Sequence, residues 1–316
     1  GHFPLTPGAT ATAIQQASEE RVWIAFHCGT TTTIGDFEGL TEALQLRDGA
    51  PLHLPHVNAY CRGRVDRPER EAMRIVELLQ DSAGVFSESY LSQINGTWGR
   101  CRQGRPESAA TRRALQGGGY EPTEAGLELA IADGYALVHV PGETTVAFGD
   151  GAEGVGYWRR NGTNVGVSFK VNQPLAAVLL ASARRTDGSP GVTALASDGG
   201  GIPRNEILRR GYQLVSMGLL SMADVVGKAS RVPAGYLGLP DKGHLGAGAD
   251  ADVIVTTDDG TVCATVGGGR LLFDGRTLTP APTTWLTTHQ GVASVKAAGL
   301  DVRVVDPFNE GSYGSS

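Results

Sequence analysis

Short apolar runs that alternate with helical stretches restrict the possible folds of this chain more than any other feature. The apolar runs cover residues 21–29, 50–63 and 84–93, and the helical stretches between them cover residues 36–49 and 67–82. The helical stretch 67–82 is amphipathic, with Pro68 near its first turn and apolar positions at Met73, Ile75, Val76 and Leu79. Alternation of this kind predicts βα units whose strands run parallel, in a sheet or a barrel.

The rest of the chain departs from this alternation. Residues 94–190 contain Gly-rich turns and shorter strand patterns, which predict an insertion with its own hairpins and a helix over 173–185. Helical patterns return after Asp198, the second of them capped by Ser221. A period-two pattern follows within 241–280, and it predicts a small antiparallel β-unit.

Composition narrows the class of protein. The 316 residues are 41% hydrophobic and 19% charged, which is typical of a soluble globular chain with a large core. The net charge is −6 and basic residues form no stripe, so we expect no nucleic-acid partner. No apolar run approaches the roughly 18 residues of a membrane span, so we expect no membrane association. Four scattered cysteines indicate a reducing compartment, the cytoplasm.

A carboxylate follows an apolar run in the stretch TALASDGGGIPRNE, residues 193–206. A charged side chain at the end of a buried strand is costly unless a positive group holds it. The three glycines after Asp198 allow backbone or a ligand to approach closely. The stretch is therefore either a strand end that carries chemistry or a flexible turn with a capping aspartate.

Three apolar runs end in residues that can bind a metal, namely His27, His56 and Asp198. The carboxyl ends of the strands of a parallel barrel lie on one face, so these side chains are expected to converge. Imidazole and carboxylate are the ligands of catalytic Zn²⁺, which lowers the pKa of a bound water to about 7. A hydrogen-bonded structural histidine is the alternative for each position. His53 is expected to face the other way from His56 and to serve packing.

The segment 223–255 carries a long motif. Its characteristic residues are Ala229, Pro233, Ala234, Leu237, Gly238, Leu239, Lys242, Gly243, His244, Leu245, Gly248, Asp250, Ala251 and Asp252. This pattern resembles the signature that closes amidohydrolase-superfamily enzymes and returns the chain to a β-sandwich beside the barrel. Asp250 and Asp252 are expected to form a turn into a strand and not to bind metal.

The resemblance extends toward the N-terminus. Asp198 is similar to the aspartate that ends barrel strand eight in that superfamily. LHLPHVNAYCRG and WIAFHCGT resemble the strand-six and strand-five segments of the D-aminoacylase, dihydroorotase and hydantoinase branches, which implies His56 and His27 as ligands. The implied fold is α/β, the C-terminal half of a TIM-type (β/α)8 barrel, strands five to eight, with part of a flanking β-sandwich. The implied division is a half-barrel over 1–240 with an insertion at about 94–190, a β-sandwich segment over 241–280 and a tail over 281–316.

One part of the superfamily pattern is missing. The chain contains no H-x-H motif, and it starts at Gly1, where strand four of the barrel would end. Half of a parallel barrel would expose its edges, so we expect a second polypeptide that carries the H-x-H half. We expect Gly1 to arise from a cleaved precursor or a split gene, and the two-chain unit to form a higher oligomer.

The resemblance implies hydrolysis of an amide or cyclic amide C–N bond, other than a peptide bond, with one or two Zn²⁺ ions. Asp198 would act as ligand and as acid/base. Asn58, Tyr60 and Arg62 would contact a small-molecule substrate, with Arg62 pairing a carboxylate or, alternatively, remaining a solvated loop residue. A deaminase of the superfamily is one alternative, although FHCGTTTT offers no glutamate for it. A non-catalytic scaffold or regulatory subunit is the other.

Overall fold

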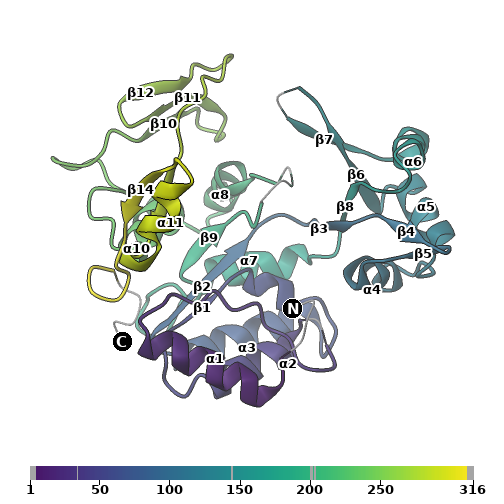
Figure 1. Ribbon diagram of the computed structural model, residues 1–316, viewed down its shortest axis with the longest axis horizontal. Coiled ribbons are helices and arrows are strands. Elements are labelled where there is room, and N and C mark those ends of the chain that lie inside the picture. The colour runs from purple at the N-terminus through teal and green to yellow at the C-terminus, as the bar shows by residue number, and fades with distance from the viewer. Residues whose placement is uncertain (1–4, 34, 144, 200–201, 203, 312–316) are drawn as a thin grey trace.

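The computed structural model describes residues 5–33, 35–143, 145–199, 202 and 204–311. The expected start of the chain at Gly1 and the glycines at 200 and 201 lie outside these residues. Figure 1 shows a central parallel sheet with a helical layer on one side, an insertion extending in one direction and small β-units in another.

Parallel strands form the centre of the fold. Strands β1 (Leu52–Leu54), β2 (Val85–Tyr90) and β9 (Ala194–Ala196) pair in the order β1-β2-β9, with both ladders parallel. A parallel bridge between Ala25 and His53 adds the 21–29 run beside β1. Four segments thus lie in parallel in chain order, as the alternation predicted. They form an open arrangement, and the described residues do not close into a barrel.

The apolar run predicted over 50–63 is only briefly a strand. β1 ends at Leu54, and a 3₁₀ helix, η1 (Val57–Tyr60), follows directly. His56 joins the two with a left-handed backbone, at φ 44°. The apolar pattern continued past the strand because Val57 and Tyr60 remain buried in the turn. The 21–29 run is likewise reduced to the single bridge at Ala25.

One face of the sheet is covered by helices α1 (Pro7–Glu19), α2 (Phe37–Leu46), α3 (Pro68–Gln80) and α7 (Pro174–Ser182). The shared core takes Ile14, Leu40, Leu52, Leu54, Ile75, Leu79 and Leu180, all fully buried. On α3 the buried stripe runs through Ala72 instead of Met73, which is 56% exposed. Ala72 lies three and four residues before Ile75 and Val76, and it therefore shares their helix face.

The opposite face of the sheet packs on the C-terminal helices. His53 points to this face, between Trp23 and Phe86, and its Nε2 lies 3.5 Å from Oε1 of Glu88. Tyr236 stacks on Phe86 with a centroid distance of 3.6 Å. His53 therefore packs on the face opposite Leu52 and Leu54, which is the packing role predicted for it.

Of the two helical patterns after Asp198, the first forms one helix and the second divides into three segments. The elements here are α8 (Ile207–Ser216), α9 (Met222–Val226), the π-helix η2 (Gly227–Arg231) and α10 (Val232–Leu237). Ser221 caps α9 in a reciprocal capping box with Asp224. In the π-turn the buried Lys228 donates its Nζ to the carbonyls of Ala181 and Val192, at 2.7 and 2.9 Å. This lysine ties the π-turn to the end of α7 and the chain entering β9.

The insertion has its own antiparallel sheet and core. Its sheet order is β3 (Asn95–Trp98), β8 (Gly166–Phe169), β6 (Ala136–Pro141) and β7 (Val146–Gly149). Its other elements are β4 (Cys101–Arg102), β5 (Arg105–Pro106), α4 (Ala109–Gly117), α5 (Glu124–Ala132) and α6 (Gly151–Arg160). Leu127, Ile131, Val138, Trp158 and Phe169 are buried in a core separate from that of the parallel sheet. These elements occupy residues 95–169 of the range 94–190, while α7 belongs with α3.

Small β-units end the chain. Strands β10 (Val253–Thr256), β11 (Val262–Gly267) and β12 (Arg270–Phe273) form an antiparallel sheet. β13 (Thr284–Thr287) and β14 (Asp301–Val304) pair in parallel across η3 (His289–Gly291) and α11 (Val292–Ala297). Ile254, Leu271 and Trp285 are 55%, 55% and 51% exposed. These units therefore present uncovered apolar side chains. Among the described residues, every helix is too short or too polar to cross a bilayer.

Candidate functional site

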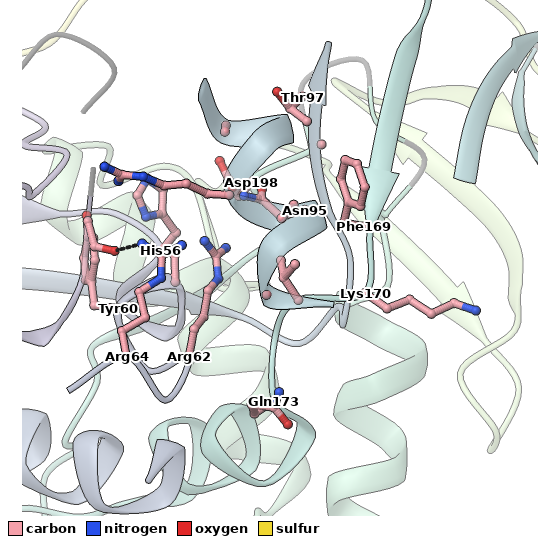
Figure 2. A pocket seen from close by; sticks show the side chains of 18 of the residues that line it. His56, Tyr60, Arg62, Arg64, Asn95, Thr97, Phe169, Lys170, Gln173 and Asp198 are labelled. Atoms are coloured by element: carbon pink, nitrogen blue, oxygen red, sulfur yellow. Dashed lines mark hydrogen bonds between the residues drawn. The ribbon is translucent and has the colours of Figure 1, made fainter. Parts of the chain in front are cut away.

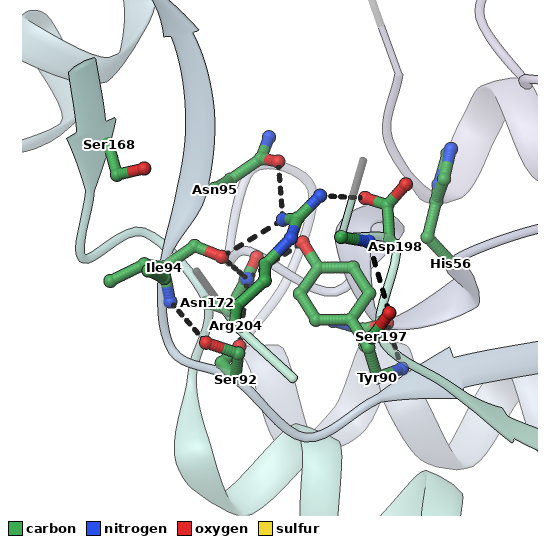
Figure 3. A network of polar contacts seen from close by, with 12 residues as sticks. His56, Tyr90, Ser92, Ile94, Asn95, Ser168, Asn172, Ser197, Asp198 and Arg204 are labelled. Atoms are coloured by element: carbon green, nitrogen blue, oxygen red, sulfur yellow. Dashed lines mark hydrogen bonds and ion pairs between the residues drawn. The ribbon is translucent and has the colours of Figure 1, made fainter. Parts of the chain in front are cut away.

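The ends of the parallel segments bring the three predicted metal-binding residues to one region. His27 follows the bridge at Ala25, His56 follows β1, and Asp198 follows β9. His56 and Asp198 both have left-handed backbones, with φ of 44° and 45°. Non-glycine residues adopt this conformation at a cost, and such strain concentrates at functional sites. Figure 3 shows His56 and Asp198 side by side.

The two histidines face each other. Nδ1 of His27 lies 2.6 Å from Nε2 of His56. Burial lowers the pKa of both imidazoles, that of His56 to about 3, so both rings are neutral at pH 7. The other nitrogen of His56, Nδ1, is buried without a hydrogen-bond partner among the described residues. Neutral imidazole is the form that binds a metal.

Asp198 is held by an arginine that the sequence reasoning did not single out. Nη2 of Arg204 lies 2.7 Å from Oδ2 of Asp198, and Arg204 is only 3% exposed. Burial raises the pKa of the Asp198 carboxyl, and the Arg204 guanidinium opposes this rise. Nη1 of Arg204 donates to the Ile94 carbonyl at 3.2 Å and to Oδ1 of Asn95 at 3.1 Å, so the insertion positions it (Figure 3). Arg204 lies within the stretch 193–206, and this was the only feature of the sequence that pointed to it.

Asn172 connects the insertion to the loop after β1. Its Nδ2 donates to the Tyr90 hydroxyl at 2.8 Å and to the Ser92 carbonyl at 3.1 Å. Its Oδ1 accepts from Nε of Arg62 at 3.0 Å. Arg62 is therefore fixed by a partner far along the chain and is not a freely solvated side chain. No sequence pattern pointed to Asn172.

The other predicted substrate contacts lie deeper. Oδ1 of Asn58 accepts from the backbone N–H of Tyr90 at 3.0 Å, and Asn58 is not part of the cavity wall. Tyr60 lines the cavity, but its hydroxyl accepts from the N–H of Cys28 at 2.9 Å. Burial raises the pKa of Tyr60, which keeps the phenol neutral. Of the three residues, Arg62 is therefore the one best placed to contact a ligand.

A cavity of about 940 Å³ lies between the strand ends and the insertion. His27, His56 and Asp198 line one part, while Tyr135 and Phe169 come from the insertion. Asp198 is the only acidic residue among the described lining residues, whereas the basic ones are Arg62, Arg64, Arg113, Lys170 and Arg204. Lys170 points away from the strand ends in Figure 2, and its Nζ donates to the Gly134 carbonyl. The described lining therefore carries more positive than negative side chains, an excess that favours anions.

His27, His56 and Asp198 are of residue types that bind metals, but they do not by themselves complete a metal site. No group of three His, Cys, Asp or Glu side chains that could hold a metal is present among the described residues. Two nitrogens on one tetrahedral Zn²⁺, each at about 2.0–2.1 Å, lie roughly 3.3 Å apart, so the imidazoles would need only a small separation. Asp198, however, is engaged by Arg204. A complete metal site therefore requires ligands beyond those described.

The fold is shared with solved hydrolases. A hydrolase-containing formyltransferase complex from Methylorubrum extorquens, determined with methylofuran, is 16% identical, with a TM-score of 0.53 over 92% of this chain. N-acyl-D-glutamate deacylase from Bordetella bronchiseptica, complexed with zinc, is 14% identical, with a TM-score of 0.54 over 86%. D-aminoacylase, described as defining a subset of amidohydrolases, is 13% identical, with a TM-score of 0.52 over 87%. No protein-family model and no curated sequence matches the chain.

These comparisons confirm the predicted resemblance at the level of the fold. The chain spans 56% of the length of the complex subunit and 58% of each of the other two proteins. The open parallel sheet is thus consistent with part of a barrel. At such identities the likeness concerns the fold alone.

Proposed function

We propose that this chain forms barrel strands five to eight of a metal-dependent amidohydrolase that cleaves a C–N bond other than a peptide bond, in an amide or cyclic amide. The observation that carries the proposal is the convergence of His27, His56 and Asp198 at the ends of parallel segments beside one cavity. The shared fold with D-aminoacylase and N-acyl-D-glutamate deacylase supports this class of reaction.

Asp198 would act as the acid/base. Its raised pKa brings the carboxyl closer to the pH at which a proton can be both accepted and released. It would take a proton from the attacking water and give it to the leaving nitrogen. Arg204 would fix its orientation through the 2.7 Å contact to Oδ2.

His27 and His56 would hold the metal, Zn²⁺ in our proposal, as one or two ions together with Asp198 and ligands from outside these residues. A bound Zn²⁺ lowers the pKa of water and polarises a carbonyl oxygen. The neutral state of both imidazoles supports their role as ligands, since protonated rings would repel a cation.

Arg62 would bind a carboxylate of the substrate. Its Nε is held by Asn172, while Nη2 is buried without a hydrogen-bond partner among the described residues. An arginine fixed at Nε presents its remaining N–H groups in a defined direction, which suits the planar carboxylate. Asn58 and Tyr60 would support this wall of the cavity.

The remaining barrel strands and the H-x-H motif would come from a second polypeptide, in a unit that forms higher oligomers. The open sheet and the exposed apolar residues of β10, β12 and β13 support additional polypeptide on these faces. Four cysteines scattered along the sequence would suit a reducing compartment, the cytoplasm.

A non-catalytic subunit is the second candidate. The ion pair between Arg204 and Asp198 favours it, because one oxygen of this carboxylate already has a positively charged partner from the chain itself. The deaminase alternative gains no such support.

Metal analysis of the intact native assembly separates the two candidates. We expect at least one equivalent of zinc per chain and hydrolysis of N-acyl amino acids or cyclic amides. His56→Ala should lower the metal content, whereas His244→Ala, outside the cavity wall, should leave it unchanged. A folded, metal-free assembly that stays inactive after zinc addition would support the scaffold instead. Native mass spectrometry of the same material should show a second chain.

A further inference from the structure

Three arginines of two neighbouring segments line the cavity. Arg62 and Arg64 lie in the loop that follows η1, and Arg113 lies on α4 of the insertion. Partial burial, followed by the nearby guanidinium groups of Arg62 and Arg113, lowers the pKa of Arg64, while the carboxylates of Asp36 and Glu71 oppose this shift. Arg64 therefore lies near both of the other guanidinium groups, and a bound anion would relieve the repulsion between them.

The neighbouring carboxylates are already engaged. Glu71 is fully buried, and its oxygens accept from the backbone N–H groups of Gly63, Val65 and Asp66 at 2.8–3.0 Å. Asp36 is buried at the start of α2 and accepts from the N–H of Gly39 at 3.0 Å. In the described part of the chain, neither these two nor any other carboxylate forms an ion pair with Arg62, Arg64 or Arg113.

The loop is nevertheless built to hold its arginines in place. Glu71 accepts from the backbone N–H groups on either side of Arg64 in the sequence, and Nη1 of Arg64 donates to the Gly35 carbonyl at 3.0 Å. Asn172 fixes Nε of Arg62 and leaves its Nη2 buried and unpartnered among the described residues. A buried guanidinium N–H without an acceptor is costly, and a bound anion removes that cost.

We propose that Arg64 and Arg113 form a second anion subsite beyond Arg62, so that the substrate carries at least two anionic groups, carboxylate or phosphate. One group would bind at Arg62 near the reacting amide, and the other would reach the wall shared by the loop and α4. The volume of about 940 Å³ accommodates such an extended ligand. The presence of an amide in the substrate rests on the proposed function, whereas the binding of anions at the arginines does not.

Calorimetric titration of the intact native protein tests the subsite without any turnover. Butyrate carries one carboxylate and glutarate carries two, while pyrophosphate tests the phosphate source. We expect glutarate or pyrophosphate to bind about tenfold more tightly than butyrate, as charge-assisted hydrogen bonds imply. Whichever dianion shows the preference identifies the chemistry of the second group.

The matched variants are Arg113→Gln and Arg105→Gln, which remove the same charge from the insertion. Arg105 is exposed and outside the cavity wall, so Arg105→Gln should keep the dianion preference. Arg113→Gln should abolish it, and Arg113→Lys, which keeps the charge, should retain a weaker preference. Equal binding of butyrate and both dianions, or an undiminished preference in folded Arg113→Gln, would overturn the subsite. A dianion preference in a protein that hydrolyses no amide would leave the subsite intact and refute the proposed function instead.

Discussion

Arg204 and Asp198 form an ion pair, with 2.7 Å between Nη2 and Oδ2, at the carboxyl end of β9. The carboxylate comes from the parallel sheet, whereas the arginine is held by Ile94 and Asn95 where the insertion begins. The guanidinium also lies 4.7 Å from the centre of the Tyr90 ring. The insertion therefore helps to set the charge state of the proposed acid/base.

Asp198→Asn should abolish turnover and leave the fold intact. The amide keeps the shape of the side chain but can neither accept the water proton nor carry the charge. We expect a loss of more than about a thousandfold in kcat, the upper part of the range for acid/base groups. Steady-state kinetics with circular dichroism as a check on folding would measure it, and turnover within tenfold of the wild type would contradict the assignment.

Arg204→Gln should shift the pH dependence of the reaction. Arg204 opposes the rise of the Asp198 pKa caused by burial, so its removal should raise that pKa further. The acidic limb of the profile of kcat/KM should move to higher pH, and activity at neutral pH should fall. Arg210→Gln, which breaks the ion pair with Glu206, is the control. An unchanged limb in folded Arg204→Gln would show that the pair does not tune Asp198.

Arg62→Lys should raise KM more than it lowers kcat. Lysine keeps the charge but loses the forked geometry and the Nε contact to Asn172. We expect an increase in KM of roughly tenfold for an N-acyl amino acid. The prediction fails when a neutral substrate of the same shape reacts as well as the acid with the wild-type protein.

Glu71→Gln should destabilise the protein by about 2 kcal/mol, because three backbone N–H groups lose their charged acceptor. Urea unfolding would measure the change. Glu77→Gln on the exposed face of the same helix removes an equal charge and should change stability little. Similar stabilities for the two variants would show that Glu71 does not anchor the arginine loop.

Lys228→Met should remove a pH-dependent part of the stability. Burial lowers the pKa of Lys228 from its usual 10.5 to about 8. Between these values the unfolded chain holds a proton that the folded chain has lost, so this group makes stability rise with pH, by up to about 1.4 kcal/mol per unit. Urea unfolding from pH 8 to 10 should show a smaller rise in Lys228→Met than in the wild type. Lys296→Met, at an exposed position, should keep the wild-type slope.

The elements set by local pattern could be predicted from the sequence. The alternation of apolar runs and helical stretches predicted parallel pairing, and the capping of α9 by Ser221 was also visible in advance. The lengths of the strands could not be predicted, because the buried turn at η1 has the same apolar pattern as a strand. The place of Ala72 instead of Met73 on the buried stripe of α3 follows from helical spacing, since Ala72 lies three and four residues before Ile75 and Val76.

By itself the sequence determined that His27, His56 and Asp198 would come together, because parallel strands present their carboxyl ends at one edge and each residue ends its own run. Only the tertiary structure decided what surrounds them. Arg113 lines the cavity from the insertion, Asn172 accepts a hydrogen bond from Arg62, and Arg204 forms an ion pair with Asp198. The order of parallel segments follows from the alternation along the chain, whereas the partner of a charge depends on which distant segments pack beside it, and no local pattern encodes that contact.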